Sequence, residues 1–263
     1  MNLGLEGKVA LVTASSKGLG KACAKELAAE GANVVMCART AETLEEAAKE
    51  VAAGAAGSVS TVVADLSGEE GVAAAIGAAL DEHGRIDILL TNTGGPPLGT
   101  FADATDEQWL EAFESLHLGA ARLIRAALPS MRENGWGRII GIQSSSVKQP
   151  IPGLTLSNGV RPAVAGLFKS LMPEIAGDNI TINLVVPGII LTDRIIMGQT
   201  ARAEAAGVTL DEQLANLAAT IPVGRLGDPA ELAAMVAFVA SERAAYVTGS
   251  VIQVDGGFVR SVV

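Results

Sequence analysis

Short runs of aliphatic, often β-branched residues alternate with longer alanine-rich segments along almost the whole 263-residue chain. The short runs have the length of strands, and the apolar residues of the longer segments recur at helical spacing. This alternation is typical of a parallel sheet that is covered by helices on both faces. We therefore predict an α/β fold built on a doubly wound parallel sheet. The expected strands are 8–13, 33–38, 59–64, 87–91, 138–143, 181–186 and 251–254, and the expected helices are 19–30, 42–53, 69–83, 106–133, 157–176 and 229–241.

The chain shows no Pro/Gly/Ser-rich linker and no shift in composition, so we expect residues 1–263 to form a single domain. The longest segment that the sheet pattern leaves unexplained is 192–222. Long connections in compact domains are often functional. We predict that this segment covers the substrate and contains short helices of its own.

The formal net charge is −10 and no basic stripe is present, which argues against a nucleic-acid partner. The cysteines, Cys23 and Cys37, have no metal-ligand spacing, and the chain has only two histidines, His83 and His117, so we expect no metal site. Neither a signal-peptide pattern nor an apolar run of membrane-spanning length is seen. We expect a soluble, reduced, cytoplasmic protein whose partner is a small-molecule substrate rather than a nucleic acid or a membrane.

A glycine-rich turn, Thr13 to Gly20 with the sequence TASSKGLG, connects the first expected strand to the first expected helix. Glycines there allow the backbone to approach a pyrophosphate closely, and a helix N-terminus offers free N–H donors. The flanking strand and helix provide the context that this motif requires. The turn therefore predicts a dinucleotide site of the Rossmann type. Its expected contacts are Ala14, Ser16, Lys17, Gly18, Leu19 and Gly20.

Two cations predict which dinucleotide is preferred. An acidic residue at the end of the second strand accepts hydrogen bonds from the ribose of NAD. This chain has Arg39 there instead, and the planar guanidinium suits a 2′-phosphate. Lys17 adds a second positive charge in the turn itself. Together these residues favour NADP(H) over NAD(H).

Several motifs, in order along the chain, resemble those of the short-chain dehydrogenase/reductase family. The turn is similar to the family motif TGxxxGxG, with Ala14 in place of the first glycine. The other matching segments are Asp65–Leu66, Asn92 and Gly94 within TNTG, Pro187–Thr192 (PGIILT), Gly224–Pro229 and Val254–Gly257.

The resemblance implies a seven-stranded sheet and a protein similar to 3-oxoacyl-carrier-protein reductases, assembled as a homotetramer or a homodimer. It implies that Asp65 and Leu66 contact the adenine, and that Ile190 and Thr192 meet the nicotinamide carboxamide. The remaining cofactor contacts implied by the matched motifs are Asn92, Gly94, Pro187 and Gly188.

The catalytic positions depart from the family pattern. In the family, a tyrosine in YxxxK supplies the proton, the lysine lowers the phenol pKa and binds the nicotinamide ribose, a serine holds the carbonyl oxygen, and an asparagine supports a water relay. Ser144 matches the serine, but Ser157 stands at the tyrosine position and Arg161 at the lysine position. His117 stands at the asparagine position. The only tyrosine, Tyr246, lies before the last strand and is not expected to be the acid.

A serine hydroxyl is a much weaker acid than a phenol, and arginine is a poor proton source. Three replacements for the lost acid remain open: a water between Ser144 and Ser157, the imidazole of His117, and Lys148 on the loop after Ser144. A packing or subunit-contact role for His117 and a solvated position for Lys148 remain open as well.

We therefore predict an NADP(H)-dependent oxidoreductase that reduces a carbonyl, or oxidises an alcohol, with a non-standard proton donor. Its catalytic candidates are Ser144, Ser157, Arg161 and His117, and Arg161 is also a candidate for binding the nicotinamide ribose. Two alternatives remain: a dinucleotide-binding protein without redox turnover, acting as a sensor or an inactive subunit, and an enzyme that uses the bound cofactor for an isomerisation or an elimination.

Overall fold

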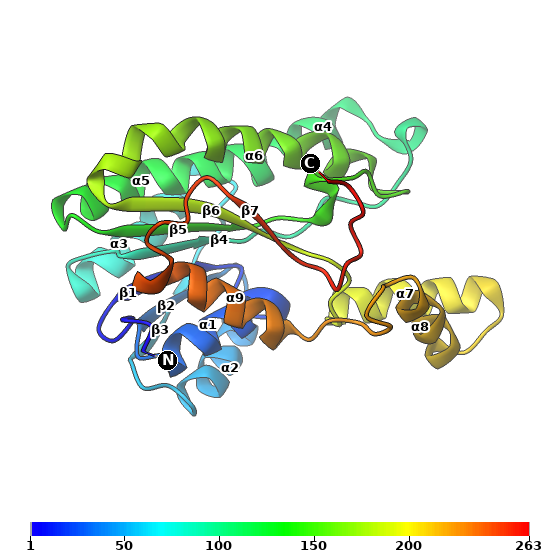
Figure 1. The fold of residues 1–263 in the computed structure, drawn as a ribbon, viewed down its shortest axis with the longest axis horizontal. Coiled ribbons are helices and arrows are strands. Elements are labelled where there is room, and N and C mark those ends of the chain that lie inside the picture. The colour runs from blue at the N-terminus through cyan, green and yellow to red at the C-terminus, as the bar shows by residue number, and fades with distance from the viewer. Residues whose placement is uncertain (1, 263) are drawn as a thin grey trace.

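A computed structural model describes residues 2–262. Its seven strands lie parallel in one sheet, in the order β3-β2-β1-β4-β5-β6-β7 (Figure 1). The order reverses between β1 and β4, as in a doubly wound Rossmann-type sheet, so the predicted fold class is confirmed. The strands are β1 (Val9–Thr13), β2 (Asn33–Ala38), β3 (Val59–Val63), β4 (Ile88–Thr91), β5 (Gly137–Ile142), β6 (Ile180–Pro187) and β7 (Val251–Val254).

The central strands are apolar on both faces because helices cover both. Every residue of β1, β4 and β5 is buried. Along the register, Leu11 of β1 pairs with Val35 of β2 on one side and with Leu89 of β4 on the other. The edge strand β3 keeps exposed positions, as an edge strand can.

Three helices pack on each face of the sheet (Figure 1). On one face, α1 (Gly18–Ala29), α2 (Ala41–Ala52) and α9 (Pro229–Ala240) enclose one apolar cluster. On the other, α3 (Glu69–His83), α5 (Gly119–Glu133) and α6 (Thr155–Ile175) enclose a second. Alanines supply much of both clusters, which explains how a chain with only 3% aromatic residues fills its core.

The helix expected over 106–133 has the correct extent but is not continuous. It consists of α4 (Asp106–Phe113), a π-helical turn (Glu114–Leu118) and α5. The extra residue of a π-turn changes the direction in which the following side chains point, and such turns are frequent at functional sites. His117 lies inside this turn.

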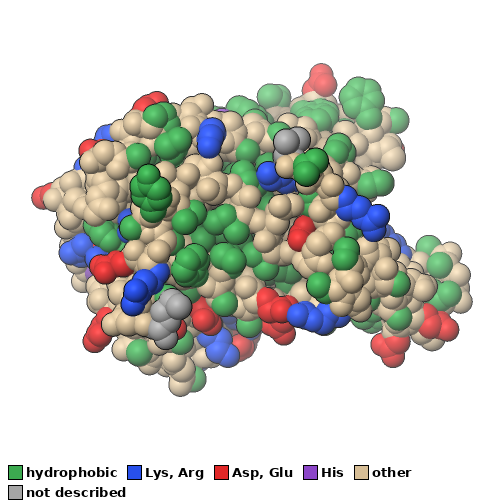
Figure 2. All heavy atoms as spheres, in the orientation of Figure 1, with side chains coloured by type: hydrophobic (Ala, Val, Ile, Leu, Met, Phe, Trp, Pro, Cys, Tyr) green, Lys and Arg blue, Asp and Glu red, His purple; other side chains and the backbone are tan. Residues whose placement is uncertain are grey.

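The segment 192–222 contains the short helices that were expected, α7 (Asp193–Ala206) and α8 (Leu210–Ala219). They pack mainly against each other and project from the body of the molecule at the right of Figure 1. No helix within residues 2–262 is both long and apolar enough to cross a membrane. On the face shown in Figure 2, acidic and basic side chains are interspersed rather than gathered by sign.

The turn between β1 and α1 contains an alanine in a left-handed conformation. Ala14 has φ +47°, and only Asn179 shares a positive φ with it among the non-glycine residues of 2–262. A Cβ atom makes this region costly. The structure thus explains why the family motif has glycine here, and it indicates that Ala14 is strained.

We predict that Ala14→Gly raises the free energy of unfolding by about 0.5–1 kcal/mol, because relief of left-handed strain outweighs the larger unfolded-state entropy of glycine. Urea titration of both proteins measures the difference. The matched control is Ala74→Gly on the exposed face of α3, which should lower stability by about 1 kcal/mol. A destabilised Ala14→Gly variant would show that the turn is not strained at this residue.

Candidate functional site

The predicted cofactor and catalytic residues gather at one edge of the sheet. The carboxyl ends of β1, β4, β5 and β6 meet there because the strands are parallel, and the β1/β4 boundary is the point where the strand order reverses. Ligands of open α/β sheets bind at such a point. From it emerge the glycine-rich turn, the loop that begins at Asn92, the loop that begins at Ser144, and the segment from Pro187 to Thr192.

The glycine-rich turn has the form of a pyrophosphate cradle. A Cβ atom on Gly20 would lie 2.3 Å from the carbonyl oxygen of Ala14, so only glycine allows this close approach. Asn92 Nδ2 donates to the same carbonyl oxygen over 3.4 Å and ties the turn to the loop after β4. Helix α1 begins after Lys17 without a side-chain cap and without an acidic residue in its first turn. Its first N–H groups are therefore available to an anion.

Two cations and a carboxylate lie toward the β2 and β3 side of the site. Lys17 and Arg39 are both exposed, and neither forms an ion pair within residues 2–262. Hydrogen bonds from Ser67 lower the pKa of Asp65, and the positive charge of Arg39 lowers it further. The side chains of Arg39 and Asp65 thus lie close enough to interact, where the adenosine end of a dinucleotide is expected.

The segment after β6 presents free backbone groups. Leu191 N–H donates to the carbonyl oxygen of Gly227 over 2.9 Å, and Gly227 N–H donates to that of Ile189 over 3.0 Å. In a parallel bridge of this kind the peptide groups of Ile190 point to the opposite side. The Ile190 N–H is therefore not used in this bridge, and the Ile190 side chain is buried. Thr192, at the end of this segment, lies beside Gly18 of the turn.

A hydrogen-bonded set of buried polar side chains forms the catalytic side of the site. Arg161 Nε donates to Ser157 Oγ over 3.0 Å, and Arg161 Nη1 donates to Gln143 Oε1 over 3.0 Å. Ser157 Oγ lies 3.4 Å from Ser146 Oγ. The backbone N–H of Ser146 donates to Ser144 Oγ over 3.2 Å. Ser157 and Arg161 are thus in direct contact, and Ser144 is connected to them through Ser146.

Arg161 is a buried cation whose hydrogen-bond partners are neutral. It is 7% exposed and forms no ion pair with any carboxylate of residues 2–262. Burial, and after it the positive charge of Arg194, lower the pKa of Arg161 to about 10. It remains protonated at neutral pH. A buried charge without a counter-charge is costly unless hydrogen bonds or a ligand compensate it.

His117 and Lys148 do not join this set. The His117 ring stacks on Phe113 with ring centroids 4.7 Å apart, and its Nδ1 is buried without a hydrogen-bond partner. Burial lowers the pKa of His117. Lys148 is half-buried and makes no side-chain hydrogen bond or ion pair with residues 2–262. Tyr246 is fully exposed, in keeping with its exclusion as the acid.

Sequence reasoning missed two members of the set. Gln143 is the partner of Arg161, Ser146 is the partner of Ser157, and neither was among the expected site residues. A signal for Gln143 was present, since it is a single amide directly after the apolar strand β5 and just before Ser144. No signal in the sequence pairs it with Arg161, which lies on a different element.

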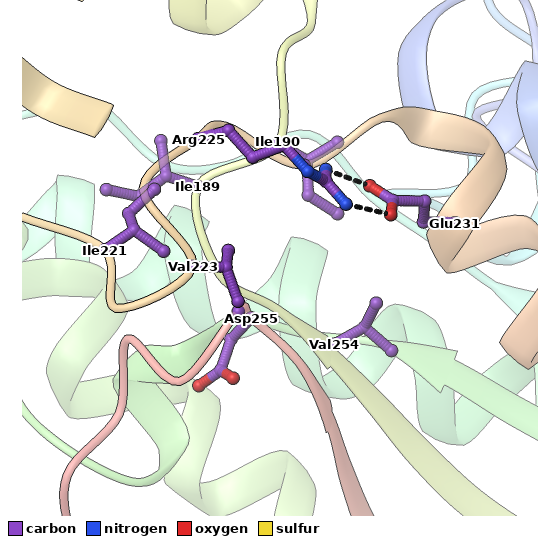
Figure 3. A pocket seen from close by; sticks show the side chains of 10 residues that line it. Ile189, Ile190, Ile221, Val223, Arg225, Glu231, Val254 and Asp255 are labelled. Atoms are coloured by element: carbon purple, nitrogen blue, oxygen red, sulfur yellow. Dashed lines mark hydrogen bonds and ion pairs between the residues drawn. The ribbon is translucent and has the colours of Figure 1, made fainter. Parts of the chain in front are cut away.

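A cavity of about 240 Å³ lies away from the serines, between the segment after β6 and the end of β7 (Figure 3). Ile189, Ile190 and Val254 are among its apolar lining residues, and the ion pair of Arg225 and Glu231 forms part of its wall. None of the catalytic set lines it. Within residues 2–262, no three His, Cys, Asp or Glu side chains gather as metal ligands.

Comparisons with known proteins agree with this geometry. Residues 13–259 match a family model described as enoyl-(acyl carrier protein) reductase. The 3-oxoacyl-[acyl-carrier-protein] reductase FabG of Haemophilus influenzae is 34% identical over 253 residues, which cover 96% of this chain and 98% of that protein.

Two solved structures are similar over nearly their whole length. The L-sorbose reductase of Gluconobacter frateurii, in complex with NADPH and L-sorbose, has a TM-score of 0.96 and 36% sequence identity, with 100% of both chains covered. YwfH, an NADPH-dependent reductase involved in bacilysin biosynthesis, has a TM-score of 0.92 and 29% identity, with 98% of this chain and 100% of that chain covered.

The partly buried imidazole of His117 is expected to contribute to the pH dependence of stability. Because its pKa is lowered in the folded protein, the unfolded chain binds this proton more readily below the ordinary value of 6.5. Stability from this group is therefore present above pH 6.5 and is lost as the pH falls. We expect His117→Asn to lose less stability than the parent protein between about pH 7.5 and pH 5. Urea titrations at both pH values measure this difference, and an equal loss in both proteins would contradict it.

Proposed function

Because the chain belongs to the short-chain dehydrogenase/reductase family, we propose that it is an NADPH-dependent reductase of a carbonyl compound in which serine hydroxyls replace the usual tyrosine. The observation that carries this proposal is the buried pair of Ser157 and Arg161, joined by a 3.0 Å hydrogen bond beside Ser144. The family positions for tyrosine and lysine thus still hold a hydroxyl with a cation behind it.

NADPH is the cofactor that the residues favour. The first N–H groups of α1 suit its pyrophosphate, and Arg39 and Lys17 are unpaired cations where a 2′-phosphate would lie. The similar L-sorbose reductase and YwfH are both described with NADPH. When bound, NADPH supplies a hydride to the carbonyl carbon.

The serine hydroxyls stabilise the negative charge that develops on the carbonyl oxygen. Ser144 Oγ accepts a hydrogen bond from the Ser146 N–H, so its own proton is free to point at the substrate. Ser157 Oγ accepts from the Arg161 guanidinium, which polarises its O–H bond and makes it a better donor. Two donors aimed at an oxyanion form the arrangement that lowers such a barrier most.

Proton balance requires one proton for the alkoxide oxygen of the product. We assign its last transfer to Ser157, whose Oγ lies 3.4 Å from the buried Ser146 Oγ, and solvent water is the source that restores the proton to Ser157. Arg161 keeps its proton and stabilises the transient charge on Ser157 Oγ. Gln143 is a positioning residue, because its hydrogen bond to Nη1 fixes the guanidinium. His117 lies outside this set, and we assign it to the packing of the π-turn.

Two further properties belong to this proposal. We propose that the segment 192–222 closes over the substrate, since α7 and α8 project from the body of the molecule (Figure 1) and Met197 on α7 is 73% exposed. We also propose self-association as a homotetramer or homodimer, since Leu110 and Phe113 expose apolar side chains on α4.

The cofactor preference has a direct test. Arg39→Ala should weaken NADPH binding about tenfold, because one charge-assisted phosphate contact is lost, and it should leave NADH binding unchanged. Titration of cofactor fluorescence measures both. Lys25→Ala, which removes an exposed cation farther along α1, is the matched control and should change neither. An equal effect of Arg39→Ala on both cofactors would show that Arg39 does not contact the 2′-phosphate.

The catalytic assignment has a second test. Ser144→Ala and Ser157→Ala should each lower kcat for carbonyl reduction roughly 100-fold, the typical cost of removing one oxyanion donor. KM for NADPH should remain within about twofold. The control is Ser115→Ala, whose hydroxyl bonds only carbonyl groups of its own helix and should leave kcat unchanged. NADPH binding without oxidation over a broad carbonyl panel would instead favour a binding protein without turnover.

A further inference from the structure

Two arginines without acidic partners lie on the substrate side of the site. Arg161 has only neutral partners, as described above. Arg194 likewise forms no ion pair within residues 2–262, and its one hydrogen bond is from Nη2 to the carbonyl oxygen of Pro96, over 3.3 Å.

Arg194 is exposed, and its guanidinium lies against the loop after β4. Its guanidinium lies so close to Gly95 that a Cβ atom there would come within 2.4 Å of Nη1. Gly95 and Pro96 belong to the loop after β4, whereas Arg194 stands in the first turn of α7. The side chain therefore bridges from the projecting segment to the loop that borders the cofactor cradle.

Arg194 acts on the reacting end of the site and stands close to the pyrophosphate end. Its positive charge, after burial, lowers the pKa of Arg161, which lies on α6. Thr192, two residues before Arg194, lies beside Gly18 at the start of α1. Two like charges held near each other without a counter-charge are disfavoured. A bound anion between them removes that cost.

We propose that Arg194 binds an anionic oxygen group, a carboxylate or a phosphate, on the carbonyl substrate. Arg161, behind it, adds positive potential and holds Ser157 toward the same molecule. This rests on the proposed reductase function and deepens it, because it makes the substrate an oxo acid or an oxo phosphate ester rather than a neutral ketone. The guanidinium fork of Arg194 suits either group.

Matched pairs of probes test this. Acetoacetate and methyl acetoacetate differ by one negative charge, as do dihydroxyacetone phosphate and dihydroxyacetone, and L-sorbose is a further neutral probe. With NADPH, we expect kcat/KM to be at least about tenfold higher for one charged probe than for its neutral partner. The pair that shows the difference distinguishes a carboxylate from a phosphate.

Three variants locate the effect. Arg194→Gln should lower kcat/KM for the charged probe by about tenfold or more, through KM, and should leave the neutral probe and the Kd of NADPH unchanged. Gly95→Ala should have the same selectivity with a smaller effect, because the added methyl displaces the guanidinium without removing its charge. Arg202→Gln, which removes an exposed charge farther along α7, should have no effect.

The alternative outcomes are distinct. Equal loss on charged and neutral probes, or no preference for charge in the parent protein, overturns the proposal. A higher Kd for NADPH in Arg194→Gln assigns the residue to the cofactor pyrophosphate and also overturns it. If NADPH binds but no probe is reduced, that result contradicts the proposed reductase function and does not concern Arg194. In that case the thermal shift of the NADPH complex by each probe still tests Arg194, since stabilisation by the charged probe should vanish in Arg194→Gln.

Discussion

The buried guanidinium of Arg161 is the interaction on which the reacting end of this site depends. Its hydrogen bonds join Ser157 on its own helix, α6, to Gln143 at the end of β5, so one side chain fixes two elements against each other. Arginine suits this role better than lysine, because its planar fork reaches two acceptors in fixed directions and it stays charged when buried. In the proposed function Ser157 takes the place of the usual tyrosine, and its hydroxyl lies 3.0 Å from Nε, a distance over which a phenol ring could not be accommodated without repacking. The two replacements are therefore physically coupled.

The sequence predicts the sheet and the cofactor frame well, because both depend on local patterns. Helix α3 and strand β7 have the predicted bounds, and the glycine-rich turn lies where the motif requires. The structure adds that Ala14 adopts the left-handed backbone of the glycine it replaces. This conformation concerns a single residue, and it is the one that the glycine of the family motif adopts easily.

The remaining features could not be predicted from the sequence because they arise from contacts between distant segments. Gln143 and Arg161 are 18 residues apart and meet only when β5 and α6 pack together. Arg194 reaches the loop at Pro96 across 98 residues of chain. The π-turn at Glu114–Leu118 could not be predicted for a different reason: one extra residue hardly changes the helical spacing of apolar residues over 28 positions. The sequence left His117 open as a replacement acid because of its place in the motif, and the stacking of its ring on Phe113 is visible only in the structure.

Local sequence patterns determine the cofactor frame, whereas contacts between distant segments determine the reacting groups. Similarity to named reductases therefore says more about the cofactor than about the reaction. The frame that binds the dinucleotide is largely made of backbone: the free N–H groups at the start of α1, the close approach at Gly20, and the peptide groups of Ile190. Side chains can change around these groups with little effect on them. In the proposed function, proton delivery and substrate choice depend instead on the side chains of Ser157, Arg161 and Arg194. The 34% identity with an acyl-carrier-protein reductase therefore says little about the groups proposed to face the substrate. Any substrate assignment has to start from those groups.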